Sequence, residues 1–165
     1  MMQKLLFLDI DGVLNTKLWY GKMNKETPKD RWGYAFDPVS VANLKRIVNE
    51  TGADIVISSS WKCVGLTELR KMWKARRLPG KIIDVTPDRY KDDELRYLDD
   101  TEIDNIRGYE IREWLSRNGK QVSHYAIIDD LYEMLPEQQD HLVMTDSETG
   151  ITDEDADRAI EILNN

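Results

Sequence analysis

Residues 5–15 of the chain read LLFLDIDGVLN. This apolar run has the length of a strand and ends in two carboxylates, Asp9 and Asp11, which are followed at once by Gly12. Because side chains alternate along a strand, the two carboxylates should point to one side of the backbone while Ile10 points to the other. Two carboxylates at the end of a buried strand are costly unless a cation or ligand compensates them. The pair is therefore a candidate functional site.

The rest of the chain alternates strand and helix patterns. Apolar runs predict further strands at 53–57, 81–85, 124–128 and 141–144, and apolar residues at helical spacing predict helices at 38–51, 65–77, 109–118 and after residue 152. This order predicts an α/β fold, a Rossmann-like open parallel sheet of about five strands with helices on both faces. In such sheets, ligands bind at the carboxyl ends of the strands. The second strand ends in Ser58 and Ser59, and the fourth in Asp129 and Asp130.

Two segments interrupt this pattern. Residues 16–36 carry five aromatic side chains without a regular period, and we interpret them either as a hairpin flap over the site or as a surface loop held on the core by its aromatics. Residues 86–106 are dominated by charge, and we interpret them either as a solvated connection at the surface or as a mobile edge of the site. Both segments are short, so we expect one domain over residues 1–165 with a minimal cap or none.

Composition limits the classes of protein. With 41% hydrophobic and 33% charged residues the chain has an ordinary globular composition, and its net charge of −8 disfavours general binding to nucleic acid or to an anionic membrane. The one cysteine, Cys63, cannot form an internal disulfide, and no apolar run is long enough to cross a bilayer. We therefore expect a cytoplasmic protein that does not associate with a membrane and has no stable protein partner.

Carboxylates that gather at one sheet edge need a divalent cation. The candidate ligands are hard oxygen atoms, and the chain has one cysteine and two scattered histidines. This donor set favours Mg²⁺ over Zn²⁺ as the cofactor.

These residues together resemble the haloacid dehalogenase-like (HAD) phosphatase superfamily. Its first motif, an apolar strand followed by DxDG, is present as LDIDGV; its second, a strand ending in Ser or Thr, as IVISSS; its fourth, a strand ending in an acidic pair, as YAIIDD. The third motif, a Lys or Arg before the fourth strand, is best matched by Arg107, with Lys62 as the rival. More narrowly, the motifs LDIDGVLN, ISSSWK, RGYEIREWL and VMTDSETGIT resemble a family of HAD domains associated with RNA-repair proteins.

The resemblance implies a Mg²⁺-dependent phosphatase acting on a phosphorylated small molecule or a nucleic-acid end. Asp9 would be the nucleophile that forms an aspartyl-phosphate, and Asp11 would be the acid and base, carrying a proton in the first step. The implied metal site consists of Asp9, Asp11 through its carbonyl, Asp129 and Asp130. The implied phosphate-binding residues are Ser59 or Ser58, Arg107 and Gly12.

Three alternatives remain beside this interpretation. A DxDG pattern also begins calcium-binding loops, but the later residues of such a loop are absent here. A receiver-like signalling domain would place its acceptor aspartate after the third strand, where this chain has Thr86 and Pro87. A catalytically silent HAD-fold binding module is disfavoured by the presence of both Asp9 and Asp11. Separately, a basic stretch in residues 70–81 is either a polyanion-binding surface or a solvated helix face.

Overall fold

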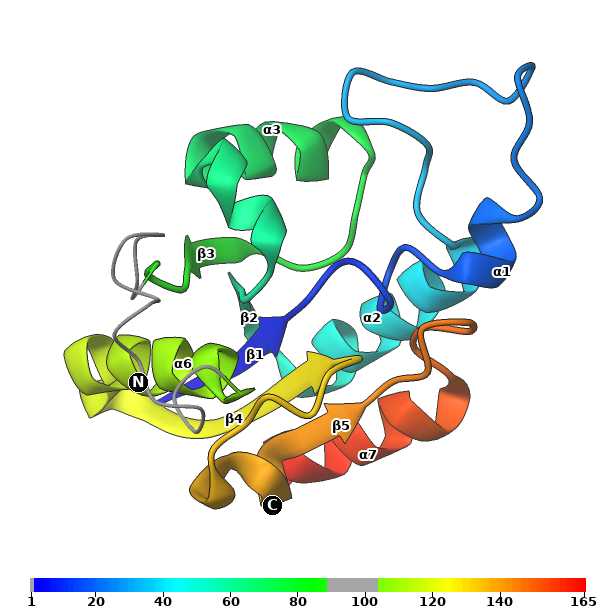
Figure 1. Ribbon diagram of the computed structural model, residues 1–165. Coiled ribbons are helices and arrows are strands. Elements are labelled where there is room, and N and C mark those ends of the chain that lie inside the picture. The colour runs from blue at the N-terminus through cyan, green and yellow to red at the C-terminus, as the bar shows by residue number, and fades with distance from the viewer. Residues whose placement is uncertain (1, 89–103) are drawn as a thin grey trace.

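A computed structural model describes residues 2–88 and 104–165 (Figure 1). The central part of the predicted 86–106 connection, residues 89–103, lies outside the described residues. The strands are β1 (Gln3–Leu8), β2 (Asp54–Ile57), β3 (Ile82–Val85), β4 (Val122–Asp129) and β5 (Leu142–Met144). The α-helices are α1 (Lys17–Tyr20), α2 (Pro38–Thr51), α3 (Leu66–Ala75), α6 (Ile106–Asn118) and α7 (Asp153–Asn164), with short 3₁₀ segments η1 (Ser60–Val64), η2 (Gly119–Gln121) and η3 (Pro136–His141).

The five strands form one parallel sheet in the order β3-β2-β1-β4-β5, which confirms the predicted Rossmann-like class. β1 is central, and its two neighbours, β2 and β4, are more than 60 residues apart in the sequence. The order along the sheet therefore reverses between β1 and β4, which is the switch point where such folds bind ligands. Among the described residues, no separate cap domain is inserted.

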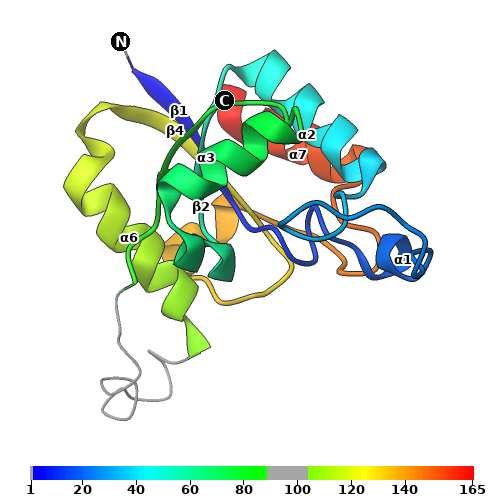
Figure 2. The same cartoon turned by 90° about the horizontal axis from the view of Figure 1, so that it is seen from above.

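Alternation along β1 divides the core into two layers. Leu6 and Leu8 pack with residues of α2, α3 and α7, whereas Leu5 and Phe7 pack with Ile111 and other residues around α6. Figure 2 shows α6 on one side of the sheet and α2 and α7 on the other. Burial on both faces explains why β1 reads as a continuous apolar run rather than an alternating one.

The predicted helix boundaries are confirmed at the capped ends. Asp37 caps α2 by accepting a hydrogen bond from the Val39 amide at 2.9 Å, and Gly52 ends the helix in a left-handed conformation with φ of 70°. Thr152 and Asp155 form the expected capping box of α7. α6 begins at Ile106, three residues earlier than predicted, and this places Arg107 within its first turn.

Residues 16–36 contain the short helix α1 and an isolated bridge between Asp30 and Gly33. Side chains attach the segment to the rest of the chain: Arg76 pairs with Asp30 at 2.7 Å, and Trp32 packs against the core. These contacts hold the segment against the rest of the chain, and its role as a flap or as a surface loop stays a prediction. No helix in the described part of the chain is long and apolar enough to cross a membrane.

Candidate active site

The carboxylates converge because β1 and β4 are neighbours. The backbone ladder continues past β1, with the Asp9 amide donating to the Ile128 carbonyl at 3.0 Å, so Asp9 lies beside Asp129 at the end of β4. One oxygen atom from each of Asp9, Asp129 and Asp130 lies within 4.8 Å of the others. The Asp9 and Asp129 side chains are buried, and Asp130 is partly exposed.

Burial sets the electrostatics of this cluster. It raises the pKa of the Asp9 carboxyl to about 6, although Arg107 and a hydrogen bond from Ser59 act in the opposite direction. Burial, followed by the charge of Asp9, raises the pKa of Asp129 to about 8. Oδ2 of Asp129 is buried and has no hydrogen-bond partner among the described residues. A cluster made of oxygen donors, one of them without a hydrogen bond, fits a hard divalent cation such as Mg²⁺.

Arg107 supplies the positive charge closest to the buried carboxylates. Its guanidinium lies 3.6 Å from Oδ1 of Asp9 and 3.7 Å from Oδ2 of Asp129, and it also donates a hydrogen bond to the Ser58 carbonyl. The rival, Lys62, is held elsewhere: its Nζ pairs with Oε2 of Glu110 at 2.6 Å. The structure thus brings Arg107, but not the ammonium group of Lys62, to Asp9.

The serines after β2 have different surroundings. The Ser59 side chain acts on Asp9, since it lowers the pKa of that carboxyl, and its hydroxyl accepts a hydrogen bond from the Trp61 amide at 3.4 Å. The Ser58 hydroxyl is fully buried and has no hydrogen-bond partner in the described part of the chain. Ser59 is therefore the serine that lies beside Asp9.

Gly12 is required by close approach as well as by backbone shape. Its φ is +76°, and a Cβ added there would lie 2.2 Å from Oδ2 of Asp130. The Gly12 carbonyl accepts a hydrogen bond from the Thr145 hydroxyl at 3.0 Å, which ties the turn to the end of β5. The absence of a side chain at residue 12 is what lets Asp130 reach the cluster.

The Asp11 side chain lies outside the carboxylate cluster. Its Oδ1 accepts from Nδ2 of Asn15 at 2.9 Å, and its Oδ2 accepts from Nε1 of Trp61 at 3.0 Å. Asp11 therefore does not contribute a side-chain ligand to the group formed by Asp9, Asp129 and Asp130. Sequence reasoning missed Trp61, because one indole two residues after Ser59 has no period or spacing that would mark it.

A cavity of about 450 Å³ opens on the side of Asp11. Its lining includes Asp11, Asp130, and Lys17 and Tyr20 from α1. Burial, and after it the charge of Asp11, raises the pKa of the Tyr20 phenol, as expected for a ring close to that carboxylate. The cavity adjoins the carboxylate cluster, because Asp130 belongs to both.

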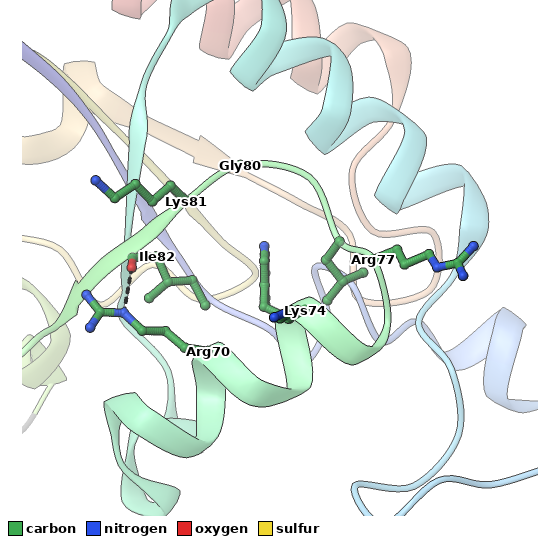
Figure 3. A pocket seen from close by; sticks show the side chains of 8 residues that line it. Arg70, Lys74, Arg77, Gly80, Lys81 and Ile82 are labelled. Atoms are coloured by element: carbon green, nitrogen blue, oxygen red, sulfur yellow. Dashed lines mark hydrogen bonds between the residues drawn. The ribbon is translucent and has the colours of Figure 1, made fainter.

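A second groove, of about 570 Å³, lies at the end of α3 (Figure 3). Four of its residues are basic: Arg70, Lys74, Arg77 and Lys81. Arg70 is engaged with the backbone, because its Nε donates to the Ile82 carbonyl at 2.9 Å. Lys74 and Lys81 are exposed, and neither forms an ion pair within residues 2–88 and 104–165. We call this surface the α3 basic groove.

An open parallel sheet with DxDG after its central strand and an acidic pair after the neighbouring strand defines the HAD class of hydrolases. The model of one family, the HAD domain in Swiss Army Knife RNA repair proteins, matches residues 5–156, and the chain belongs to that family. Comparisons with curated proteins and with solved structures give no match.

Proposed function

We propose that the chain is a Mg²⁺-dependent phosphomonoester hydrolase that works through an aspartyl-phosphate on nucleotide or nucleic-acid-end phosphates. The observation that carries the proposal is the convergence of Asp9, Asp129 and Asp130, with Arg107 and Ser59 both facing Asp9. Family membership supports the general class of reaction. We also propose that the protein is cytoplasmic, because its one cysteine cannot form an internal disulfide and disulfides are rare in the cytoplasm.

Asp9, Asp129, Asp130 and the Asp11 carbonyl would hold the metal ion. When bound, Mg²⁺ supplies positive charge that offsets the repulsion between a carboxylate and a phosphate. The raised pKa values of Asp9 and Asp129 support this assignment, as does Oδ2 of Asp129, which accepts no hydrogen bond from the described residues.

Asp9 is the nucleophile in the proposed reaction. One of its carboxylate oxygens forms a bond to phosphorus while the bond from phosphorus to the leaving oxygen breaks. Asp11 gives its proton to that leaving oxygen. In the second step a water oxygen attacks phosphorus, Asp11 takes the proton from the water, and the Asp9 carboxylate is released.

Arg107 and Ser59 bind the non-bridging oxygens of the transferred phosphoryl group. Arg107 is suited to this role because its guanidinium presents several donors in one plane and is already close to Asp9. The cavity beside Asp11 accommodates the leaving group, and the lack of a cap among the described residues favours access for large substrates.

The alternatives are less well supported. Receiver domains have the strand order 2-1-3-4-5, whereas this sheet has the order β3-β2-β1-β4-β5. A silent binding module would not need a buried, costly group of carboxylates with an arginine beside them.

The test is phosphate release from a panel of nucleotides, sugar phosphates and oligonucleotides phosphorylated at the 3′ or 5′ end, with and without Mg²⁺. Asp9→Asn should abolish turnover. Asp54→Asn, which changes a carboxylate at the start of β2, is the matched control and should retain activity. Full activity of Asp9→Asn would refute the mechanism, and a wild-type protein inactive on every substrate would favour the silent module.

A further inference from the structure

We infer that Trp61 is the positioning residue of the acid and base carboxylate, Asp11, which it orients through a hydrogen bond from its indole ring. The inference rests on the proposed function, because it concerns the proton transfers assigned to Asp11. The contact that carries it is the 3.0 Å hydrogen bond from Nε1 of Trp61 to Oδ2 of Asp11. Family motifs give the neighbouring serines a role in phosphate binding but give Trp61 none.

The indole ring is fixed from two directions. Its plane meets that of Phe36 edge to face, with ring centroids 5.9 Å apart, and Phe36 is itself buried. The backbone amide of Trp61 donates to the hydroxyl of Ser59, the residue that caps η1, at 3.4 Å. The donor that reaches Asp11 is thus attached to the same turn as the serine that faces Asp9.

Trp61 restrains Asp11 in a way that the other donor does not. Asn15 bonds the second carboxylate oxygen, but Asn15 belongs to the same turn as Asp11, since its carbonyl accepts from the Gly12 amide at 2.8 Å. Trp61 instead comes from the end of a neighbouring strand. Asp11 is an exposed residue, so without Trp61 the only hydrogen bond among the described residues that restrains its carboxyl group comes from Asn15 in its own turn.

The hydrogen bond is compatible with both proposed steps. An ionised carboxylate offers about four acceptor positions and a protonated carboxyl still offers about three, so the donors of Trp61 and Asn15 do not displace the transferred proton. Trp61 therefore holds the direction of the Asp11 carboxyl group throughout the reaction. Loss of this direction weakens proton donation, which matters most when the leaving oxygen is strongly basic.

The test compares Trp61→Phe with wild type on two esters, an alkyl phosphate and p-nitrophenyl phosphate. The substitution keeps an aromatic ring against Phe36 and removes the N–H donor. The value of kcat/KM should fall by about tenfold or more on the alkyl ester, whose leaving group needs a proton, and by less than about threefold on the nitrophenyl ester. Asp11→Asn should show the same pattern with larger losses.

Trp32→Phe is the matched control. Nε1 of Trp32 also donates to a carboxylate oxygen, that of Glu68 at 3.2 Å, but Glu68 lies on α3 and has no part in the proposed reaction. This variant should leave kcat/KM unchanged on both esters. Equal losses of Trp61→Phe on both esters, or no loss on either, would overturn the inference while the proposed function stands. The proposed function fails separately, if wild type releases phosphate from no member of the substrate panel described above.

A second measurement tests the contact without turnover. In a ¹H–¹⁵N spectrum, Asp11→Asn should move the indole resonance of Trp61, identified by its loss in Trp61→Phe, and leave that of Trp32 in place. An unmoved Trp61 indole resonance would show that the hydrogen bond is absent and would also overturn the inference.

Discussion

Gly12→Ala should remove most of the binding of Mg²⁺ to the protein. The added Cβ would lie 2.2 Å from Oδ2 and 2.4 Å from Cγ of Asp130. To reach an ordinary van der Waals distance, the carboxylate must retreat by roughly 1 Å. Metal–ligand distances tolerate about 0.2 Å, so the displacement takes Asp130 out of the proposed metal site. We expect an affinity loss of about 10- to 100-fold.

Gly52→Ala separates this effect from backbone strain. Gly52 has φ of +70°, close to the +76° of Gly12, but a Cβ there would meet nothing within 4 Å. Both variants should therefore lose about 1–2 kcal/mol of stability from the left-handed backbone. Only Gly12→Ala should also lose metal affinity.

The assay is thermal unfolding with and without Mg²⁺ at about 100 times the wild-type Kd. At that concentration binding stabilises wild type by about 2.7 kcal/mol, and a 100-fold weaker site gains only about 0.4 kcal/mol. For a chain of this length, the wild-type shift corresponds to roughly 5–10 °C. The reasoning is refuted if Gly12→Ala keeps the wild-type shift, or if Gly52→Ala loses as much of it.

Three further predictions concern individual charges. In metal-free protein, the raised pKa of Asp9 gives stability that is complete below about pH 4 and is lost as the pH rises to about 6. Above pH 6, Asp9→Asn should therefore have a larger free energy of unfolding than wild type, by on the order of 3 kcal/mol, measured by chemical denaturation. Lys62→Met leaves Glu110 buried without its partner and should cost about 3–5 kcal/mol in chemical denaturation; a loss of phosphate binding at unchanged stability would contradict this structural role. Lys74→Glu in the α3 basic groove should weaken binding of a phosphorylated oligonucleotide, measured by fluorescence anisotropy, and should reduce the slope of log K against log salt concentration by about one unit. Lys45→Glu on α2 is the control and should change neither the affinity nor the slope.

Much of the fold was predictable from local sequence. Apolar runs of strand length, helical spacing and capping residues such as Asp37 and Gly52 act over a few residues, and they located the strands and the longer helices α2, α3, α6 and α7. The position of carboxylates after apolar strands was likewise visible, because a charged residue at such a place has few explanations other than a site. The conformation and contacts of residues 16–36 were not predictable, because they depend on partners such as Arg76 that are distant in the sequence.

The sequence alone determined the parallel α/β class, the family motifs and the oxygen-rich donor set, because each is encoded in residue types at fixed short spacings. Tertiary structure decided that β4 lies beside β1, that Arg107 rather than the Lys62 ammonium approaches Asp9, and that Trp61 reaches Asp11. These outcomes depend on how strands and helices from separate parts of the chain pack, and no local spacing records that packing. The physical reason is that a side chain's neighbours across the sheet edge are set by strand order and helix placement.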